Sequence, residues 1–432
     1  MKPWISVLAL GVIGSAVAPS TALACGGCFA PPGAVQVVTD HRMALSISAD
    51  RTILWDQFRY SGRPSDFSWI LPIRNGPDVR IEVADNRFLT ALDNLSAPVL
   101  NAPQRPYCEA DSDSSFLTGA RGASAPPSSA ADSGVAVLQE QVVGPYMTAV
   151  VRSDDPAALR TWMRENGYSV PSAIEPVIDF YVAQRMDFIA LRLRMGEGVE
   201  QMTPIRVTTP GLSPTLPLRM IAAGVADKVG LLLMVIAGSR YEAMNFPNGE
   251  ITPAQLTYDF NAPTAPADDF RRAFEALNRT NGGRLWLTES ADQVSLATVE
   301  RASQLSGGGR VPVGGATVTS DDARVAFQGI GNNATLTRLR ADLAPTALDR
   351  DLQLIASDLG ERDRNHTYGT IRNTPPPCGS EAGSRAEYLG CAVTPGMKGT
   401  SGGLLVTGLA GLGLAWRRRR RSTVSAGGGA SR

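Results

Sequence analysis

Apolar and polar residues alternate through the long middle of this 432-residue chain, and this period of two constrains the fold more than any other feature. Successive side chains of a β-strand point to opposite faces, so the alternation is typical of strands with one buried face. We expect strands in residues 35–60, 66–74, 79–85, 135–151, 187–195, 202–210, 215–224, 230–238, 323–329, 334–342 and 349–357.

Helical spacing appears between these strands. Apolar residues three and four apart predict helices in residues 86–96, 153–168, 171–184, 266–280 and 290–304. Asp85 is the expected N-cap of the first helix, and Ser153 or Asp154 that of the second. The sequence therefore predicts an α+β fold, with an antiparallel-strand-rich body and several packed helices between two specialised ends.

The first 24 residues have the pattern of a secretory signal peptide. Lys2 supplies a positive end, an apolar run of about 15 residues follows, and Ala22-Leu23-Ala24 matches the small residues that signal peptidase accepts. Cleavage between Ala24 and Cys25 would make Cys25 the first residue of the mature protein. A lipid-modified Cys25 is the alternative, although Ala22 stands where a lipoprotein signal has leucine.

The other end has an uncharged stretch, residues 399–416, followed by five arginines. Eighteen helical residues span roughly 27 Å, which is close to the thickness of a bilayer's hydrocarbon core. We expect a transmembrane helix whose arginines stay in the cytoplasm. Its anchor residues are Gly402, Leu404, Leu405, Leu409, Leu412, Leu414 and Trp416, and its positive cluster is Arg417, Arg418, Arg419, Arg420 and Arg421.

These features divide the chain into parts. They are a signal peptide (1–24), an exported domain (25–358), a Gly/Pro linker (359–398), a hydrophobic helix with its arginines (399–421) and a tail (422–432). The exported domain is long enough for two β-rich subdomains. Its residues 109–134 are rich in Ser, Ala, Pro and Gly, which predicts a mobile insert.

The formal net charge of zero hides an asymmetry between the ends and the body. Seven of the 41 basic residues (Lys2, Arg417–Arg421 and Arg432) lie in the ends, whereas all 41 acidic residues lie between them, so the body carries about −7. This charge argues against nucleic acid as a partner. We expect a protein retained in the cell envelope, with its body outside the cytoplasm and a membrane or surface partner.

The five cysteines, in an oxidising compartment, predict disulfides with one thiol left over. The candidates are Cys25, Cys28, Cys108, Cys378 and Cys391, and the sequence leaves their pairing open. A redox Cys-x-x-Cys pair needs a preceding strand and a following helix, whereas here a signal peptide precedes Cys25 and two prolines follow Cys28. Zinc would need a second Cys/His pair at short spacing, which the chain lacks.

No catalytic, cofactor-binding or metal-ligating constellation stands out. Gly329-x-Gly331-x-x-Ala334 outlines a dinucleotide fingerprint, but the alternation that follows it favours a strand where the fingerprint needs a helix. His41 lies in strand-like sequence and His366 in an expected surface turn, without a nucleophile elbow. Trp55, Trp69, Trp162 and Trp286 are expected in the core. We therefore assign no catalytic or metal residue and no cofactor.

Several segments occur together in an order typical of one family. They are "ACGGCF" after the signal, then "FSWILPI", "VGPYMTAVV", "LRTWMRENGY", "PLRMIAA" and "LTRLRADLAPTALDRDL". This set, from Cys25 to about Ser357, resembles the bacterial domain-of-unknown-function family 2330, which implies export but no activity, cofactor or site residue. The end of the chain is similar to myxobacterial C-terminal sorting domains, although Cys391 lies about ten residues before the apolar run.

One short sequence occurs twice. The tripeptide Pro-Ile-Arg lies in two predicted strands, at Pro72–Arg74 and at Pro204–Arg206. Two related β-subdomains would explain the repeat, and so would chance. The function that fits the whole chain is a non-catalytic binding or envelope-assembly module. The alternative is an anchored extracytoplasmic enzyme, a hydrolase or thiol oxidoreductase, whose acidic residues are scattered in sequence.

Overall fold

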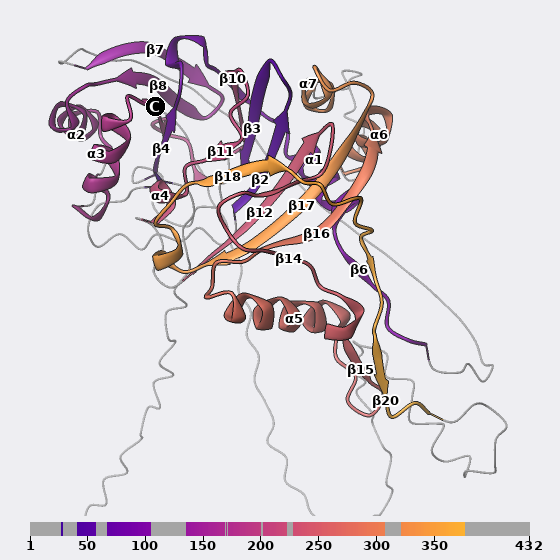
Figure 1. Ribbon diagram of the computed structural model, residues 1–432. Helices are drawn as coiled ribbons and strands as arrows, with labels where there is room; N and C mark the ends of the chain where they lie inside the picture. Colours follow the sequence, from indigo (N-terminus) through magenta and orange to yellow (C-terminus); the bar gives the residue numbers. More distant parts are fainter. Residues whose placement is uncertain are drawn as a thin grey trace, which may run out of the picture. The chain divides into compact units, whose positions relative to one another are not determined.

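Two β-sheets form the centre of the fold, and the chain is mixed α+β with a sheet-rich body, as the alternating pattern predicts (Figure 1). The structure is a computed structural model. It describes residues 27–28, 41–57, 67–104, 135–168, 170, 172–199, 202–222, 228–306 and 321–375. The predicted signal segment before Gly27, the insert 109–134 and the predicted membrane helix lie outside the described residues.

The smaller sheet has five strands in the order β1-β4-β9-β8-β7, and all of its pairs are antiparallel. Its strands are β1 (Gly27–Cys28), β4 (Ser68–Ile73), β7 (Ala136–Val143), β8 (Tyr146–Arg152) and β9 (Asp187–Leu193). The backbone register places Cys28 opposite Trp69.

The larger sheet has eight strands in the order β14-β16-β17-β12-β2-β3-β10-β5. They are β2 (His41–Ile47), β3 (Arg51–Gln57), β5 (Arg80–Val83), β10 (Ile205–Pro210), β12 (Val229–Ala237), β14 (Asn248–Gly249), β16 (Trp286–Ser295) and β17 (Asn333–Leu343). Its pairs are antiparallel except for β12 with β2 and β14 with β16.

The two sheets pack face to face across one apolar core. In β9, Ile189 and Leu191 belong to this core, whereas Phe188 and Ala190, which alternate with them, face the other way. In β12, Leu233 also belongs to the shared core. The period of two thus divides each strand between an inner face shared by the sheets and an outer face.

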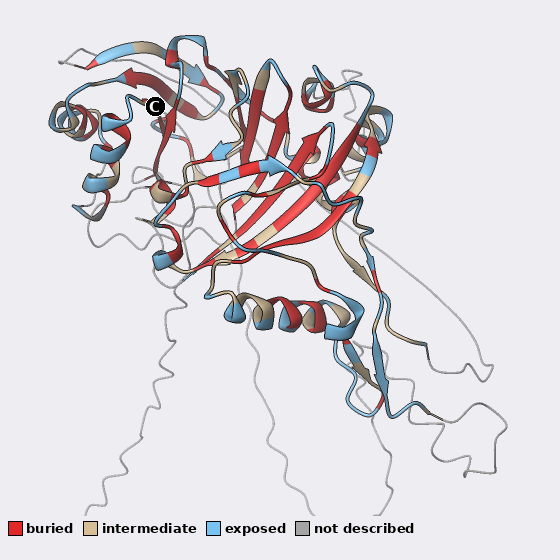
Figure 2. Cartoon of the chain, in the orientation of Figure 1, coloured by how far each residue is buried: buried red, intermediate tan, exposed pale blue. Residues whose placement is uncertain are grey.

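Helices cover both outer faces, which makes four layers. The smaller sheet is covered by α2 (Pro156–Glu165) and α3 (Glu175–Ala183), and the larger by α1 (Asn86–Ser96), α6 (Leu296–Leu305) and α7 (Asp322–Phe327). The short α4 (Leu218–Ile221) contributes to the shared core and to the core under α2 and α3, and α5 (Pro266–Thr280) packs on β16. Figure 2 shows buried residues along the central strands and alternating buried and exposed residues along α5.

Short strands complete the fold. β11 (Thr215–Leu216), β18 (Leu352–Ala356) and β13 (Tyr241–Ala243) form a three-stranded sheet. β6 (Val99–Leu100) pairs with β19 (Asn365–His366), and β15 (Thr257–Asp259) pairs with β20 (Thr370–Arg372). The strands therefore continue into the beginning of the stretch that the sequence assigns to a linker.

The helix N-termini test the predicted caps. Asp85 caps α1, because its carboxylate accepts a hydrogen bond from the backbone amide of Arg87 at 2.8 Å. The cap of α2 is Asp155 rather than Ser153 or Asp154, and its carboxylate accepts from the amide of Ala157. The predicted caps lie one or two residues too early. Pro156 favours the first helical position, and the N-cap is the residue directly before that position.

One predicted element was wrong, and two others were right only in part. Residues 323–329 were expected as a strand, but residues 323–327 lie in α7 and a turn follows, since a run this short does not let its periodicity separate the two states. Residues 290–295 belong to β16, which pairs with β17 as far as Ser295, so the helix begins only at Leu296. In the predicted strand 215–224, the described residues form the short β11 and then α4, because Pro217 has no N–H with which to continue the strand.

Other predictions are confirmed. The residues that follow the Gly329 turn form the strand β17. This agrees with the predicted strand, whereas a dinucleotide fingerprint would need a helix there. The four tryptophans assigned to the core are all buried: Trp55, Trp69, Trp162 and Trp286. Within the described part of the chain, no helix is both long enough and apolar enough to span a membrane.

Candidate functional site

The inner faces of the two sheets separate at one end and leave a cleft of about 280 Å³. Its deep walls are apolar, with Leu45 and Leu54 from the larger sheet opposite Leu71 and Ile73 from the smaller one. A cavity of about 150 Å³ lined by apolar side chains is already large enough to bind benzene. The cleft therefore has room for a ring with substituents or a short alkyl chain.

Polar side chains line the same cleft where it meets solvent. They are Arg74, Gln184, Ser213, Thr215 and Gln353. Among the described residues, no hydrogen bond or ion pair engages any of these five side chains. An apolar interior with a few unengaged polar groups is the usual composition of a small-molecule site.

The position of Arg74 is fixed by the turn that follows β4. Ile73 pairs with Asp187 of β9, and Asn75 then adopts a left-handed conformation with φ of 54°. The amide of Gly76 donates to the Asp187 carboxylate at 2.7 Å, and Arg152 donates to the same carboxylate at 2.6 and 2.7 Å. The backbone on both sides of Arg74 is thus held by one buried aspartate.

Gly76 is required at this turn. A Cβ at that position would lie 2.7 Å from Oδ2 of Asp187, closer than such atoms can approach. The glycine therefore permits the amide–carboxylate hydrogen bond that closes the turn.

The lining of the cleft also includes a tyrosine–aspartate pair. The Tyr181 hydroxyl donates to Oδ1 of Asp351 at 2.5 Å, and the amide of Arg219 donates to the same oxygen at 3.2 Å. Burial raises the pKa of the Asp351 carboxyl above its ordinary value. Burial, together with the charge of Asp351, also raises the pKa of Tyr181. The hydroxyl therefore keeps its proton and can donate this hydrogen bond throughout the physiological pH range.

A loop after β10 forms a third side of the cleft. The Thr52 hydroxyl donates to the carbonyl of Gly211 at 3.1 Å and accepts from the amide of Ser213 at 2.8 Å. Gly211 has φ of 78°, a conformation in which glycine is favoured. Two strands of the larger sheet thus hold the loop that carries Ser213 and Thr215.

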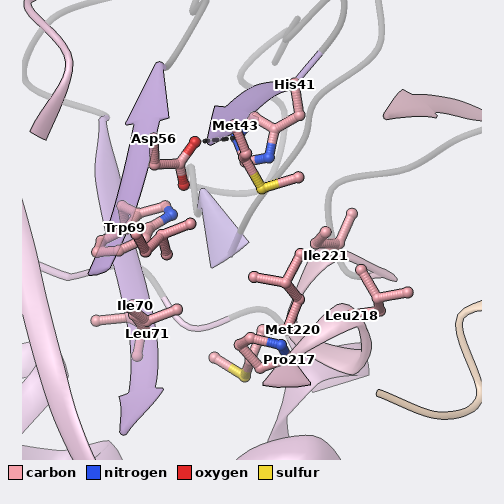
Figure 3. Close-up of a pocket in the computed structure, with 12 residues that line it drawn as sticks. His41, Met43, Asp56, Trp69, Ile70, Leu71, Pro217, Leu218, Met220 and Ile221 are labelled. Carbon is pink, nitrogen blue, oxygen red and sulfur yellow. Dashed lines mark ion pairs between the residues drawn. The ribbon is translucent and has the colours of Figure 1, made fainter. Parts of the chain in front are cut away.

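A smaller cavity of about 30 Å³ adjoins the cleft and shares four lining residues with it: Leu54, Leu71, Leu216 and Pro217. Figure 3 shows this cavity. His41 and Asp56 line this cavity with their side chains directed toward each other, as the dashed line in Figure 3 marks. His41 Nε2 lies 3.4 Å from Asp56 Oδ1, and the residues are 1% and 2% exposed.

Apart from the pair itself, the described residues that line this cavity are apolar, and they include Met43, Ile70 and Met220. Burial lowers the pKa of His41 to about 3 and raises that of Asp56 to about 8. The favoured state at neutral pH therefore has a neutral imidazole beside a protonated carboxyl group.

A third cavity, of about 610 Å³, lies between α5 and the strands β16 and β17. The acidic groups that line it are already paired, since Asp268 binds Arg271, Glu289 binds Arg340 and Asp342 binds Lys228. The charges of this cavity are thus engaged within the protein, whereas the polar side chains of the cleft are not.

Glu289 itself belongs to a buried charge network that the sequence did not reveal. It lies at a β-bulge between Thr288 and Ser290, and its two oxygens accept from Arg338 and Arg340 at 2.5 Å each. A bulge re-aims a side chain, which explains how a carboxylate reaches two arginines of the neighbouring strand.

The predictions for the two histidines differ in outcome. His41 begins β2, as its strand-like sequence predicted. The prediction of a surface turn for His366 was wrong: it lies in β19, 5% exposed, and its ring contacts that of Phe270 with centroids 4.9 Å apart. Its Nε2 lies 3.2 Å from the carbonyl oxygen of Glu289, so His366 links the C-terminal strands to β16.

The other residues singled out from the sequence fall largely outside the described part. Ala24, Cys25, Cys108, Cys378 and Cys391 lie there, as do the predicted anchor residues and the arginine cluster. Of the cysteines, only the strand position of Cys28 is described. Within the described residues, no group of three or more His, Cys, Asp or Glu could hold a metal ion.

Sequence reasoning did not single out Tyr181 or Asp351, because their separation of 170 residues leaves no local signal. The repeated Pro-Ile-Arg did contain the arginine of the cleft. Its two copies end in different surroundings, Arg74 at the end of β4 and Arg206 near the start of β10.

Comparison with known proteins gives one match. The model of a family described as "Uncharacterized protein conserved in bacteria (DUF2330)" matches residues 19–347. That span includes the cleft except for Asp351, which directly precedes β18, and Gln353 in β18. No curated protein and no solved structure matches the chain.

Proposed function

This chain belongs to the bacterial family DUF2330, and from that premise we propose that it is an exported envelope protein whose body binds a small amphiphilic molecule between its two sheets. The observation that carries the proposal is the cleft of about 280 Å³, apolar inside and polar at its mouth. A cleft of this size, with an apolar interior and a few polar side chains at its mouth, has the usual form of a small-molecule site.

A binding role also fits the small number of reactive groups in the cleft. Asp351 is the single carboxyl group among the described residues that line it. Hydrolysis by paired acids needs two converging carboxyl groups, one to donate and one to accept a proton. The cleft therefore favours recognition over catalysis.

The alternative is an anchored extracytoplasmic enzyme, and the His41–Asp56 pair is the observation in its favour. Perturbed titratable pairs are more frequent at active sites than elsewhere. Both residues are buried beside a cavity of only about 30 Å³, so a substrate would reach them only after the surrounding side chains moved. The binding proposal needs no such movement.

Export and retention complete the proposal. The pattern ending at Ala24 supports secretion, and the uncharged run before Arg417 supports a membrane anchor. Mass spectrometry of the mature N-terminus should find Cys25 first, and an intact Met1 would refute export. Deletion of residues 402–421 should release the body from the membrane fraction, and unchanged fractionation would refute the anchor.

Ligand binding can be measured by equilibrium dialysis of radiolabelled octanol against the full-length protein in phosphatidylcholine nanodiscs, with empty nanodiscs as the blank. Ser213→Trp places a large ring in the cleft and should abolish the retained signal. Leu212→Trp is the matched control, because this neighbouring residue is 60% exposed and does not line the cleft. Equal retention by both variants would contradict the proposal.

A further inference from the structure

We infer that the ligand of this cleft carries an anionic group and that Arg74 binds it at the mouth. The inference rests on the proposed function and names its ligand class: an oxyanion, such as a carboxylate, sulfate or phosphate, joined to a short apolar body. The apolar part would lie between the sheets, and the anion would meet the guanidinium where the cleft opens.

The first argument is the contrast between the two Pro-Ile-Arg arginines. The guanidinium of Arg206 is neutralised within the protein by Glu82, Asp321 and Asp322, at distances of 2.8 to 3.0 Å. Arg74, at the equivalent place in its own tripeptide, has no ion pair or hydrogen bond from its guanidinium among the described residues. The charge of Arg206 is thus engaged in ion pairs within the protein, whereas the guanidinium of Arg74 is available to a ligand at the cleft.

The second argument is that Arg74 is placed in advance. Its backbone is held between the Ile73–Asp187 pair and the hydrogen bond from Gly76 to Asp187. Because this backbone is already ordered, only the side-chain rotamers of Arg74 lose conformational entropy when an anion binds. A planar guanidinium also matches an oxyanion with two parallel hydrogen bonds, which makes it the preferred partner for carboxylate, sulfate and phosphate.

The third argument concerns the charge around the cleft. Asp351 is the single carboxyl group of the described lining, and no ion pair joins it to Arg74. Its Oδ1 already accepts from Tyr181 and from the amide of Arg219. The guanidinium of Arg219 adds a second cation beside the wall, since its central carbon lies 4.2 Å from the ring centroid of Phe180. The local field thus favours an anion over a cation.

The test compares probes that share an alkyl chain and differ in charge. Dissociation constants of octyl sulfate, octanol and octyltrimethylammonium are measured on the full-length protein in nanodiscs, against empty nanodiscs. Inorganic sulfate alone tests whether the apolar part is needed. The variants are Arg74→Gln and Arg74→Lys, with Arg80→Gln as the control, because Arg80 is exposed and does not line the cleft.

The expected result is that octyl sulfate binds wild type about tenfold or more tighter than octanol, as a charge-assisted hydrogen bond allows. Arg74→Gln should remove this preference and leave octanol binding unchanged. Arg74→Lys should retain part of it, and Arg80→Gln should retain all of it. Inorganic sulfate should not bind measurably.

Two kinds of failure are distinguishable. If octanol binds as tightly as octyl sulfate, if octyltrimethylammonium binds tightest, or if Arg74→Gln leaves the preference intact, the anionic ligand is refuted while the binding role stands. If inorganic sulfate binds as well as octyl sulfate, the amphiphilic ligand class is refuted. If none of the three octyl probes binds above the blank, the proposed function fails together with this inference.

Discussion

The buried His41–Asp56 pair makes a quantitative prediction about stability. Folded Asp56 keeps its proton up to about pH 8, whereas the unfolded carboxyl loses it near 3.8. Between these values the folded state binds one more proton, so the free energy of unfolding falls by about 1.4 kcal/mol per pH unit. His41 acts in the opposite direction from about 3 to 6.5, because the unfolded imidazole binds the extra proton there.

The two contributions cancel where their windows overlap, from about pH 4 to 6.5. Above 6.5 only the Asp56 contribution remains, so the pair should reduce wild-type stability by about 2 kcal/mol up to pH 8. Asp56→Asn keeps the shape of the side chain but cannot ionise. The stability of this variant relative to wild type should therefore rise steadily with pH between 4 and 8.

The assay is urea unfolding of the full-length protein in nanodiscs at a series of pH values, followed by tryptophan fluorescence. Trp69 lines the same cavity as the pair and Trp55 is the residue before Asp56, so both should report its opening. Asp78→Asn, at an exposed residue, corrects for the loss of one carboxyl group. A difference between Asp56→Asn and wild type that stays flat or falls from pH 4 to 8 would refute the neutral buried pair.

Other parts of the structure give further predictions. Glu289→Gln should destabilise the fold by about 3 kcal/mol in urea unfolding, because it leaves two arginines without their buried carboxylate; a loss below about 1 kcal/mol would contradict this. Gly76→Ala should weaken octyl sulfate binding, since its Cβ would displace the Asp187 carboxylate, and unchanged affinity would show that the turn does not position the site. Octyl sulfate should bind more tightly as pH falls toward the raised pKa of Asp351, because protonation of this carboxyl group removes a negative charge beside Tyr181 and Arg219; Asp351→Asn should abolish this dependence, and an opposite trend would exclude it. Thiol labelling without reduction should find at most one free cysteine, and four or five would refute the predicted disulfides.

Much of the fold could be predicted from the sequence because its strands have one periodic face each. In β4, Trp69, Leu71 and Ile73 point into the shared core and Ile70 points out, which is the alternation that the sequence displays. The prediction failed where a segment was too short for its period to be read, as in α7. It also failed for His366, whose burial depends on Phe270, almost a hundred residues earlier in the chain.

The four-layer arrangement and the cleft could not be predicted in the same way. The cleft forms where Leu45, Leu71 and Val207 from three separate strands meet, and no local pattern indicates that a gap remains between them. Arg74 stood out only as part of a repeated tripeptide. What distinguishes it from Arg206 is the presence of acidic partners from β5 and α7, which is a property of the packed structure.

The most direct test of a ligand-binding cleft is to locate a bound amphiphile on the protein. An octanoate analogue with a diazirine at the end of its chain is photolysed with the full-length protein in nanodiscs, and the labelled peptides are sequenced by mass spectrometry. Labelling should fall on the walls of the cleft, at Leu45, Leu71 or Val207, and should be lost in Ser213→Trp but not in Leu212→Trp. Labelling confined to residues outside the cleft, or unchanged in Ser213→Trp, would contradict the account.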